Sequence, residues 1–268
     1  MPRRAIGGIP PVSREQVRGI SNAANALSHL LWLFQRQEPE VVELVEARGS
    51  QGFPHYLTSR LGVLPEERWA AAVYIAPESL IQHLLPRCRE LDPPAYLEAS
   101  LDAAGRALRR LHPALPPAGL RELAEAAAPE GDLPSAWASL PRSGNPHQDA
   151  IRDAMVLREE RAEGHYQAAR EKGLDPLQLL VLTALWRRQP QDSIGRNFKW
   201  SQEAIEVAAA SLAERGWVGT EGELTALGIA VREEIERATD QLAERPLMAV
   251  PEPRRGPLLA QLSGLASV

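Results

Sequence analysis

The segment that most constrains this chain is 149–172, which combines helical spacing with charged residues on its apolar side. Apolar residues recur here every three or four positions, as expected of an amphipathic helix. Arg158 and His165 fall on the same stripe, with the small Ala162 between them. A buried charge costs free energy unless it is paired or hydrogen-bonded. The segment therefore predicts a central helix whose inward face needs partner side chains or a ligand.

Helical spacing dominates the first half of the chain as well. No segment of residues 13–128 alternates convincingly between apolar and polar positions, so we expect an N-terminal helical domain there. Residues 129–148 hold four prolines and are predicted to form a linker. A second domain, which includes the central helix, is expected over 149–245. Residues 1–12 and 246–268 are rich in Pro and Gly and are predicted to be a flexible arm and a flexible tail.

Composition argues against several classes of protein. No run of 18 apolar residues occurs, so we expect no membrane-spanning segment, and the N-terminus lacks the apolar core of a secretory signal. Cys88 is the single cysteine, which excludes an internal disulfide and fits a reducing compartment. The net charge of −5 argues against broad affinity for nucleic acid. These features predict a cytoplasmic protein with no membrane partner.

The C-terminal part has the order of elements of a winged helix-turn-helix. Residues 176–188 are predicted to form an apolar helix, 189–200 an irregular segment and 201–215 a second helix. Residues 217–225 are predicted to form two short strands around a Gly-containing turn, ahead of a long final helix. Over 174–245 this order resembles the C-terminal half of MarR-type regulators. The expected fold class is therefore all-α with a small β-wing, an N-terminal helical domain being followed by a C-terminal winged-helix-like domain.

The predicted recognition helix has the wrong charge for a DNA-reading surface. Phosphate contacts need Lys, Arg or amide donors, because counterion release supplies most of the affinity. The helix over 201–215 and the following turn instead carry five glutamates against one arginine: Glu203, Glu206, Glu214, Glu221 and Glu223 against Arg215. Four basic residues lie nearby in the sequence, so the charge pattern does not exclude a contact with DNA: Arg187, Arg188, Arg196 and Lys199. We expect the helix-turn-helix to serve packing rather than DNA binding.

Several strings together resemble an actinobacterial family of helical proteins described as helix-turn-helix proteins. They are NALSHLLWLFQRQEPE, which holds His29, REERAEGH over 158–165, GLDPLQLLVL, ELTALG and IERATDQLA. The resemblance implies a histidine in the first helix, within a string similar to EPxHAVTYFAPE, and a central string similar to REHRGDGH. His29 and most of the central string match, whereas Glu160 stands where the family has a histidine. The likeness covers most of residues 20–250 and implies no particular reaction.

Two histidines and neighbouring carboxylates are the candidate chemical groups. His165, His29 and Glu160 are the predicted catalytic residues, because an imidazole beside a carboxylate can bind a metal or move a proton. The alternative is that His29 is a hydrogen-bonded core histidine and that Arg158 pairs with Glu159 or with another carboxylate. The predicted ligand-binding residues, which supply charged groups and aromatic walls, are Arg158, Glu159, Tyr166, Trp32 and Tyr74.

The cofactor is left open by the sequence. No H-x-x-x-H, C-x-x-C or H-E-x-x-H motif occurs, so the spacing matches no standard metal site. A haem needs one axial histidine, which His29 or His165 could supply. The cofactor is therefore unknown, with a metal or a haem as options.

Two functions follow as hypotheses. The first is a cytoplasmic protein that binds a small, anionic organic ligand, or transforms it as an enzyme of bacterial secondary metabolism. Its pocket lies between the domains around His29, Arg158 and His165, since an arginine suits a carboxylate or another anionic oxygen group. The alternative is a ligand-responsive DNA-binding transcription regulator, which requires a homodimer to align two recognition helices.

Overall fold

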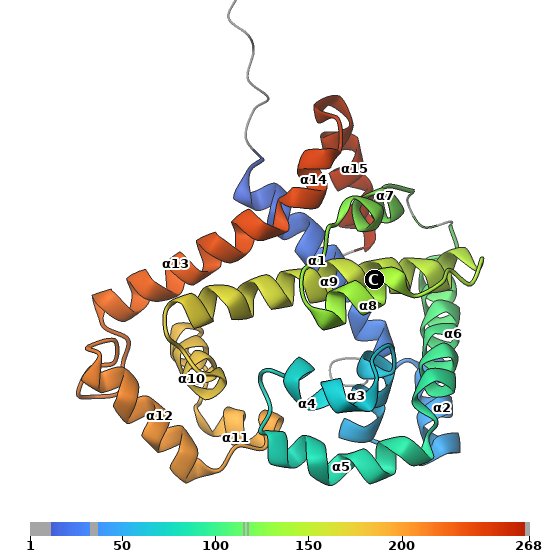
Figure 1. The fold of residues 1–268 in the computed structure, drawn as a ribbon. Coiled ribbons are helices and arrows are strands. Elements are labelled where there is room, and N and C mark those ends of the chain that lie inside the picture. Colours follow the sequence, from blue (N-terminus) through green and yellow to red (C-terminus); the bar gives the residue numbers. More distant parts are fainter. Residues whose placement is uncertain (1–11, 33–36, 115, 117, 266–268) are drawn as a thin grey trace, which may run out of the picture.

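The computed structural model describes residues 12–32, 37–114, 116 and 118–265. The predicted N-terminal arm lies outside the described residues except for Val12. Figure 1 shows an arrangement built from helices, with α9 running across its middle. In the part of the chain that the structure describes, the elements are α1 (Arg14–Leu31), α2 (Pro39–Arg48), α3 (Phe53–Leu61), the short 3₁₀ helix η1 (Glu66–Arg68), α4 (Trp69–Ala72), α5 (Glu78–Glu90), α6 (Pro93–Leu111), α7 (Ala118–Ala126), α8 (Asp132–Ser139), α9 (Pro146–Glu171), α10 (Pro176–Trp186), α11 (Asp192–Phe198), α12 (Gln202–Glu214), α13 (Ala226–Ala243), α14 (Arg245–Ala249) and α15 (Glu252–Leu265).

The central helix predicted from the sequence is α9. Its first turn is capped by the Asn145 side chain, which accepts hydrogen bonds from the backbone N–H groups of His147 and Gln148, and Pro146 occupies the first helical position. The helix packs against α1, α6, α7, α8 and α13. Because it contacts elements from both ends of the chain, α9 is the element around which the others are arranged.

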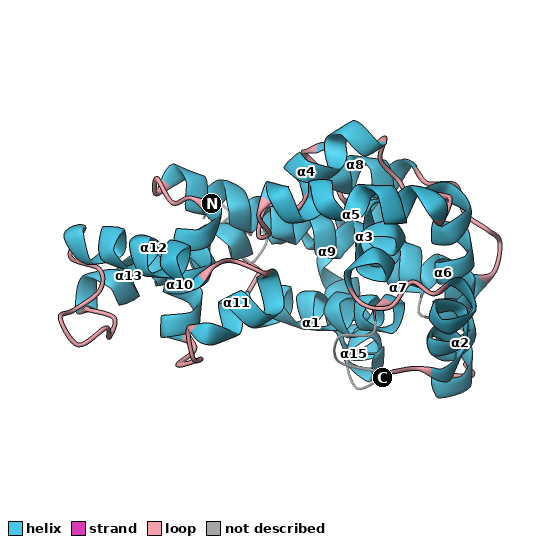
Figure 2. Ribbon diagram, turned by 90° about the horizontal axis from the view of Figure 1, so that it is seen from below, coloured by secondary structure: helices cyan, strands magenta, loops and turns pink. Residues whose placement is uncertain are grey.

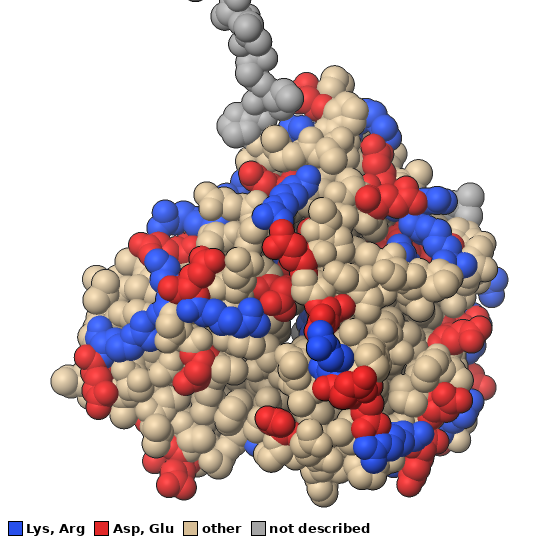
Figure 3. All heavy atoms as spheres, viewed as in Figure 1, with Lys and Arg blue, Asp and Glu red and all other residues tan. Residues whose placement is uncertain are grey.

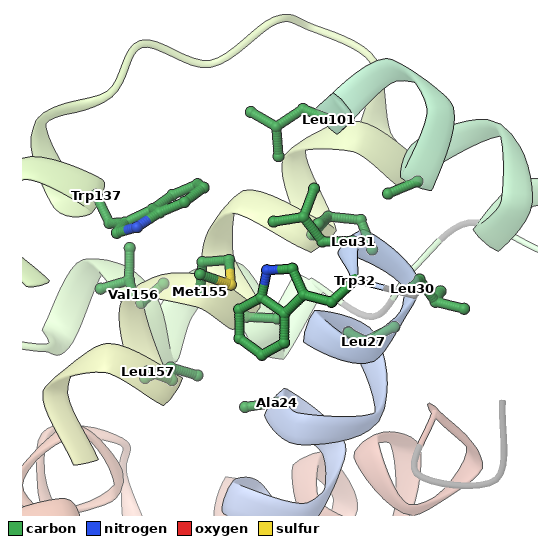
Figure 4. Packing of buried hydrophobic residues seen from close by; sticks show 14 of the residues in the cluster. Ala24, Leu27, Leu30, Leu31, Trp32, Leu101, Trp137, Met155, Val156 and Leu157 are labelled. Carbon is green, nitrogen blue, oxygen red and sulfur yellow. The ribbon is translucent and has the colours of Figure 1, made fainter. Parts of the chain in front are cut away.

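Two hydrophobic cores meet along α9. Ile151 and Met155 in its first half belong to a large core formed with α1, α6 and their neighbours. Figure 4 shows Trp32, at the end of α1, among Leu27 of the same helix and Met155 of α9. Ala169, in the second half of α9, belongs to another core, formed with α10, α12 and α13. The single helix therefore links the two halves of the molecule.

The predicted β-wing is wrong. Figure 2 shows helices and loops and no strand among the described residues. Between α12 and α13 there is one isolated antiparallel bridge, Val218 to Leu224. The Gly219 N–H donates to the Glu223 carbonyl at 2.8 Å, but the chain enters α13 at Ala226 and leaves no length for a strand. A ladder this short, with no further strand to pair with, stays a loop. The fold is all-α.

The segment predicted to be irregular contains a helix. α11 forms because Ile194 is buried in the second core and Asp192 pairs with Arg196 one turn later. Lys199 then adopts a left-handed conformation, with φ of 63°, and ends the helix. Burial of one apolar side chain has outweighed the poor helix propensity of this stretch.

Two further segments are more ordered than their composition indicates. The predicted linker contains α8, whose buried Trp137 donates its indole N–H to the Arg60 carbonyl at 3.1 Å. The predicted tail contains α14 and α15, and α15 packs against α1 and α7. Leu258, Leu262 and Leu265 form the buried stripe of α15 at helical spacing. The Pro and Gly content of the tail concealed this stripe.

The described residues were searched for a helix that could span a membrane. No helix there is long and apolar enough to cross a lipid bilayer.

The thiol of Cys88 is buried and does not form a disulfide. Burial raises the pKa of this thiol.

Candidate functional site

A cavity of about 480 Å³ lies where the two halves meet, lined by residues of α1, α9, α10 and α13. Arg158, His165 and Tyr166 of α9 are all in its wall. Arg158 and His165 are seven residues apart, which is two helical turns, so one face of α9 presents both. The structure thus brings together three of the residues that were predicted to form a site.

Arginine dominates the charged lining of this cavity. One carboxylate, Glu236, also lines it. A second carboxylate, Asp240, lies within 2.9 Å of Arg161 and within 3.6 Å of Arg18. Each of the four helices or its end contributes guanidinium groups to the lining. They belong to Arg18 of α1, Arg158 and Arg161 of α9, Arg187 directly after α10, and Arg232 of α13.

Arg232 is the most deeply buried of these arginines, with 1% of its surface exposed. Its Nη1 donates to Oε1 of Glu236 at 2.6 Å, and its guanidinium lies 4.8 Å from the ring centroid of Trp186. Its Nε is buried and has no hydrogen-bond partner among the described residues. Burial lowers the pKa of Arg232, although Glu236 opposes the shift. A buried cation with an unused donor is costly.

His165 is held as a neutral imidazole. Its Nδ1 lies 3.0 Å from Oγ1 of Thr239, and the Thr239 hydroxyl donates to the Ile235 carbonyl at 2.7 Å. Burial lowers the pKa of His165 to about 4, and the positive charge of Arg232 acts in the same direction while Glu236 opposes it. At neutral pH the ring therefore carries one proton and no charge.

Arg158 and Glu159 belong to a buried ion-pair network on α9. Nη1 of Arg158 donates to Oε1 of Glu159 at 2.6 Å, while Arg60 of α3 donates to both carboxylate oxygens. Burial alone would raise the pKa of Glu159, but Arg158 and Arg60 outweigh it and hold this pKa at about 2. The guanidinium of Arg158 also lies 4.7 Å from the ring centroid of Trp32. Pairing of Arg158 with Glu159, the alternative considered from the sequence, is thus present in the structure.

Glu159 is not part of the lining of the arginine-lined cavity. It lines a second cavity of about 260 Å³ on another side of α9, together with Arg60 and Tyr166. Tyr166 borders both cavities and stacks on Tyr74 with ring centroids 4.5 Å apart. The Tyr74 hydroxyl donates to the Leu174 carbonyl at 3.2 Å, so this tyrosine joins the two halves without lining the larger cavity.

Two predicted catalytic residues lie elsewhere. The α1 residues in the cavity wall include Asn22 and Asn25, and His29 follows one turn later on the same stripe, outside the lining. The imidazole of His29 lies instead near Trp32, with ring centroids 6.3 Å apart. Glu160 is half-buried between the charges of Arg245 and Glu130, also outside the lining. Burial raises the pKa of Glu160 to about 7.

Several residues of the cavity were not predicted from the sequence. Arg161 lies in the same REERAEGH string as Arg158, one turn further along α9. Arg232, Glu236 and Thr239 of α13 follow one another at intervals of four and three residues. That spacing places them on one helical face, and it is the same signal that singled out α9. The polar stripe of α13 could therefore have been found by the same rule.

The surface of α12 carries acidic and apolar side chains. Glu203, Glu206 and Glu214 are exposed, and Val207 between them is 66% exposed. Arg215, which follows α12, donates to the carbonyls of residues 172 and 173, and its guanidinium lies 3.7 Å from the Trp217 ring centroid. Figure 3 shows positive and negative groups interspersed on this face of the molecule, with no continuous basic stripe.

The metal option has no ligand cluster among the described residues. No group of three or more His, Cys, Asp or Glu side chains in that part of the chain is arranged to hold a metal ion. Of the two histidines considered as metal or haem ligands, His165 lines the cavity and His29 lies outside its lining.

Comparison with protein families gives a match over nearly the whole chain. The model of a helix-turn-helix family matches residues 21–268, which is nearly the whole chain. No curated protein and no solved structure matches the sequence or the fold.

Proposed function

This chain belongs to that helix-turn-helix family, and from this premise we propose that it binds a small organic anion in the cavity between α1, α9, α10 and α13. The observation that carries the proposal is the set of five arginines in one cavity wall against a single lining carboxylate. A transformation of the bound ligand, a role in secondary metabolism and an actinobacterial origin stay predictions.

The balance of charge supports an anionic ligand. Like charges gathered in a partly enclosed space repel one another more strongly than in bulk water. Three carboxylates pair with the lining arginines, namely Glu159, Glu236 and Asp240, and two positive charges are still left over. Arg60 and Arg14 share two of the same carboxylates, which reduces the compensation further. Guanidinium groups bind carboxylates and phosphates through two parallel hydrogen bonds, so an oxygen-bearing anion suits this wall.

The volume of the cavity is compatible with a small-molecule ligand. About 480 Å³ falls within the range of pockets that hold small molecules. Trp186 and Tyr166 add aromatic surface to the charged wall. Arg18 and Arg187 are exposed, whereas Arg232 is buried, so positive charge extends from the rim to the interior. This gradient would attract an anion from solvent.

The first experiment is native mass spectrometry of protein purified without added ligand, followed by thermal unfolding in dianions of known structure. The probes are malate, succinate and sulfate, each compared with sodium chloride at the same ionic strength. Binding to the folded state alone raises the unfolding temperature, and the stabilisation grows with the logarithm of the ligand concentration relative to its dissociation constant. We expect at least one organic dianion to raise it more than chloride does. Equal unfolding temperatures in all four salts, with no co-purifying molecule, would refute the proposal.

A second candidate function is supported by the family description. A ligand-responsive regulator would use the helix-turn-helix to bind DNA as a dimer. The exposed glutamates of α12 oppose this use, because they would face phosphates. The likeness to MarR-type regulators stays a prediction for the helices α10 to α13. Fluorescence anisotropy with duplex DNA tests the candidate: binding that weakens steeply between 50 mM and 200 mM salt would favour it.

A further inference from the structure

We infer that the anion bound in this cavity carries a hydroxyl group beside its charged group, and that His165 recognises the hydroxyl. The ligand would then be a hydroxy acid anion rather than a simple carboxylate. This inference rests on the proposed function and goes beyond it, because it names the chemical class of the ligand and the residue that selects it.

The tautomer of His165 is the first step. Thr239 has one hydroxyl proton, and it donates that proton to the Ile235 carbonyl at 2.7 Å. The Thr239 oxygen can then act only as an acceptor toward Nδ1 of His165, 3.0 Å away. Oε1 of Glu236 lies 4.0 Å from the same nitrogen and also favours a proton there. These contacts assign the ring proton to Nδ1 and leave Nε2 with a lone pair.

The surroundings of Nε2 form the second step. Nε2 makes no hydrogen bond with any described residue, although His165 lines the cavity. The charged groups that act on this ring are Arg161 of α9, Arg187 after α10, and Arg232 and Glu236 of α13. A protonated, donating imidazole is disfavoured in this environment by burial and by the neighbouring arginines. The cavity therefore offers a hydrogen-bond acceptor within a wall of cations.

The choice of ligand class follows from this pairing. A bare carboxylate oxygen placed beside the Nε2 lone pair would be repelled, whereas a hydroxyl would donate to it. An ammonium group could also donate, but Arg161 and Arg232 would repel its charge. A hydroxyl beside a carboxylate satisfies the arginines and the imidazole together. Sites that hydrogen-bond a ligand hydroxyl reject the analogue without it, because a polar group is then left unpaired.

The test compares malate with succinate, which differ by one hydroxyl group. Both are titrated calorimetrically at pH 8 and constant ionic strength, and both enantiomers of malate are used. We expect one enantiomer to bind about 10- to 100-fold more tightly than succinate. Equal affinities for malate and succinate would overturn this inference and leave the proposed function supported. Binding of neither acid, together with no co-purifying molecule and no effect of sulfate above chloride, would overturn both.

Two matched variants separate recognition from folding. Thr239 is a positioning residue, and Thr239→Val removes the acceptor that holds the proton on Nδ1. We expect the preference for malate to fall to about threefold or less while succinate still binds. Thr220→Val is the control, because Thr220 is exposed between α12 and α13 and does not line the cavity. The malate preference should persist in it, and its loss would contradict the role of Thr239.

A spectroscopic measurement on the unmodified protein keeps the inference testable if Thr239→Val does not fold. Nitrogen-15 NMR distinguishes a protonated from an unprotonated ring nitrogen. We expect the His165 ring at pH 8 to carry its proton on Nδ1. A proton on Nε2 would overturn the inference, since the ring would then offer a donor to the cavity.

Discussion

Arg60 of α3 and Glu159 of α9 form a bidentate ion pair, with Nε to Oε1 and Nη2 to Oε2 both 2.8 Å, although 99 positions separate them in the chain. Their exposed fractions are 1% and 2%. Arg158 donates to the same carboxylate through Nη1. This hydrogen bond holds the Arg158 guanidinium at the wall of the arginine-lined cavity. One buried carboxylate therefore ties α3 to α9 and also positions a residue of the candidate site.

Replacing Glu159 with glutamine should destabilise the protein by about 3–5 kcal/mol, because Arg60 would stay buried without its counter-charge. Urea unfolding followed by circular dichroism measures the change. Arg121→Gln is the control, since Arg121 and Glu125 form an exposed pair one turn apart on α7. Its unfolding curve should superimpose on that of the wild type. A Glu159→Gln protein of unchanged stability would contradict the importance of the buried pair.

The stability of the protein should depend on Glu160 at neutral and alkaline pH. Burial raises the pKa of this carboxyl from 4.5 to about 7 in the folded state. The folded state thus favours the protonated form. Its contribution is fully present below pH 4.5 and is lost as the pH rises through 7.

Glu160→Gln should therefore match the wild type at pH 4.5 and exceed its free energy of unfolding at pH 8. The difference is on the order of 1–3 kcal/mol, since one pKa unit corresponds to about 1.4 kcal/mol and partial exposure reduces the effect. Glu171→Gln, at the exposed end of the same helix, is the control. Its effect should not change between the two pH values, and a pH-independent Glu160→Gln effect would speak against the buried carboxyl.

Neutralising Arg187 should weaken anion binding. Arg187→Gln removes one exposed guanidinium from the cavity rim, so we expect about a two- to fivefold loss of affinity for the tightest-binding dianion. The loss should shrink at high salt because exposed charges are screened. Arg188→Gln is the matched control, because the neighbouring Arg188 is exposed but does not line this cavity. Equal losses in both variants would point to a general effect of net charge.

Reversing the charge of α12 should leave ligand binding intact. The Glu203→Lys and Glu206→Lys double variant changes two exposed side chains that lie outside the cavity wall. We expect its affinity for the tested dianions to stay within about twofold of the wild type, since the screening length at physiological salt is about 8 Å. Calorimetric titration measures it. A tenfold change would show that the α12 surface and the cavity are coupled, as in a ligand-responsive regulator.

Local periodicity determined the helical class and the inward face of α9. The 3.6-residue repeat placed Arg158 and His165 on one stripe, and both line the cavity. The Thr225 cap marks where α13 begins, whereas α9 begins at Pro146, three residues before the predicted start of the central helix. The excess of glutamate over arginine in 201–215 also indicated the acidic surface of α12. These features depend on neighbours a few residues away, so the sequence alone contains them.

Long-range packing decided the rest. Burial of Ile194 in the second core stabilises α11 as a helix. Between α12 and α13 the chain forms one isolated bridge, from Val218 to Leu224, instead of the predicted wing. The meeting of α9 with α13 determined which arginines converge and put the Thr239 oxygen beside His165. The same packing ended the cavity one turn before His29. Helical spacing shows which side of a helix is covered, but the covering element comes from a distant part of the chain, so its identity required the tertiary structure.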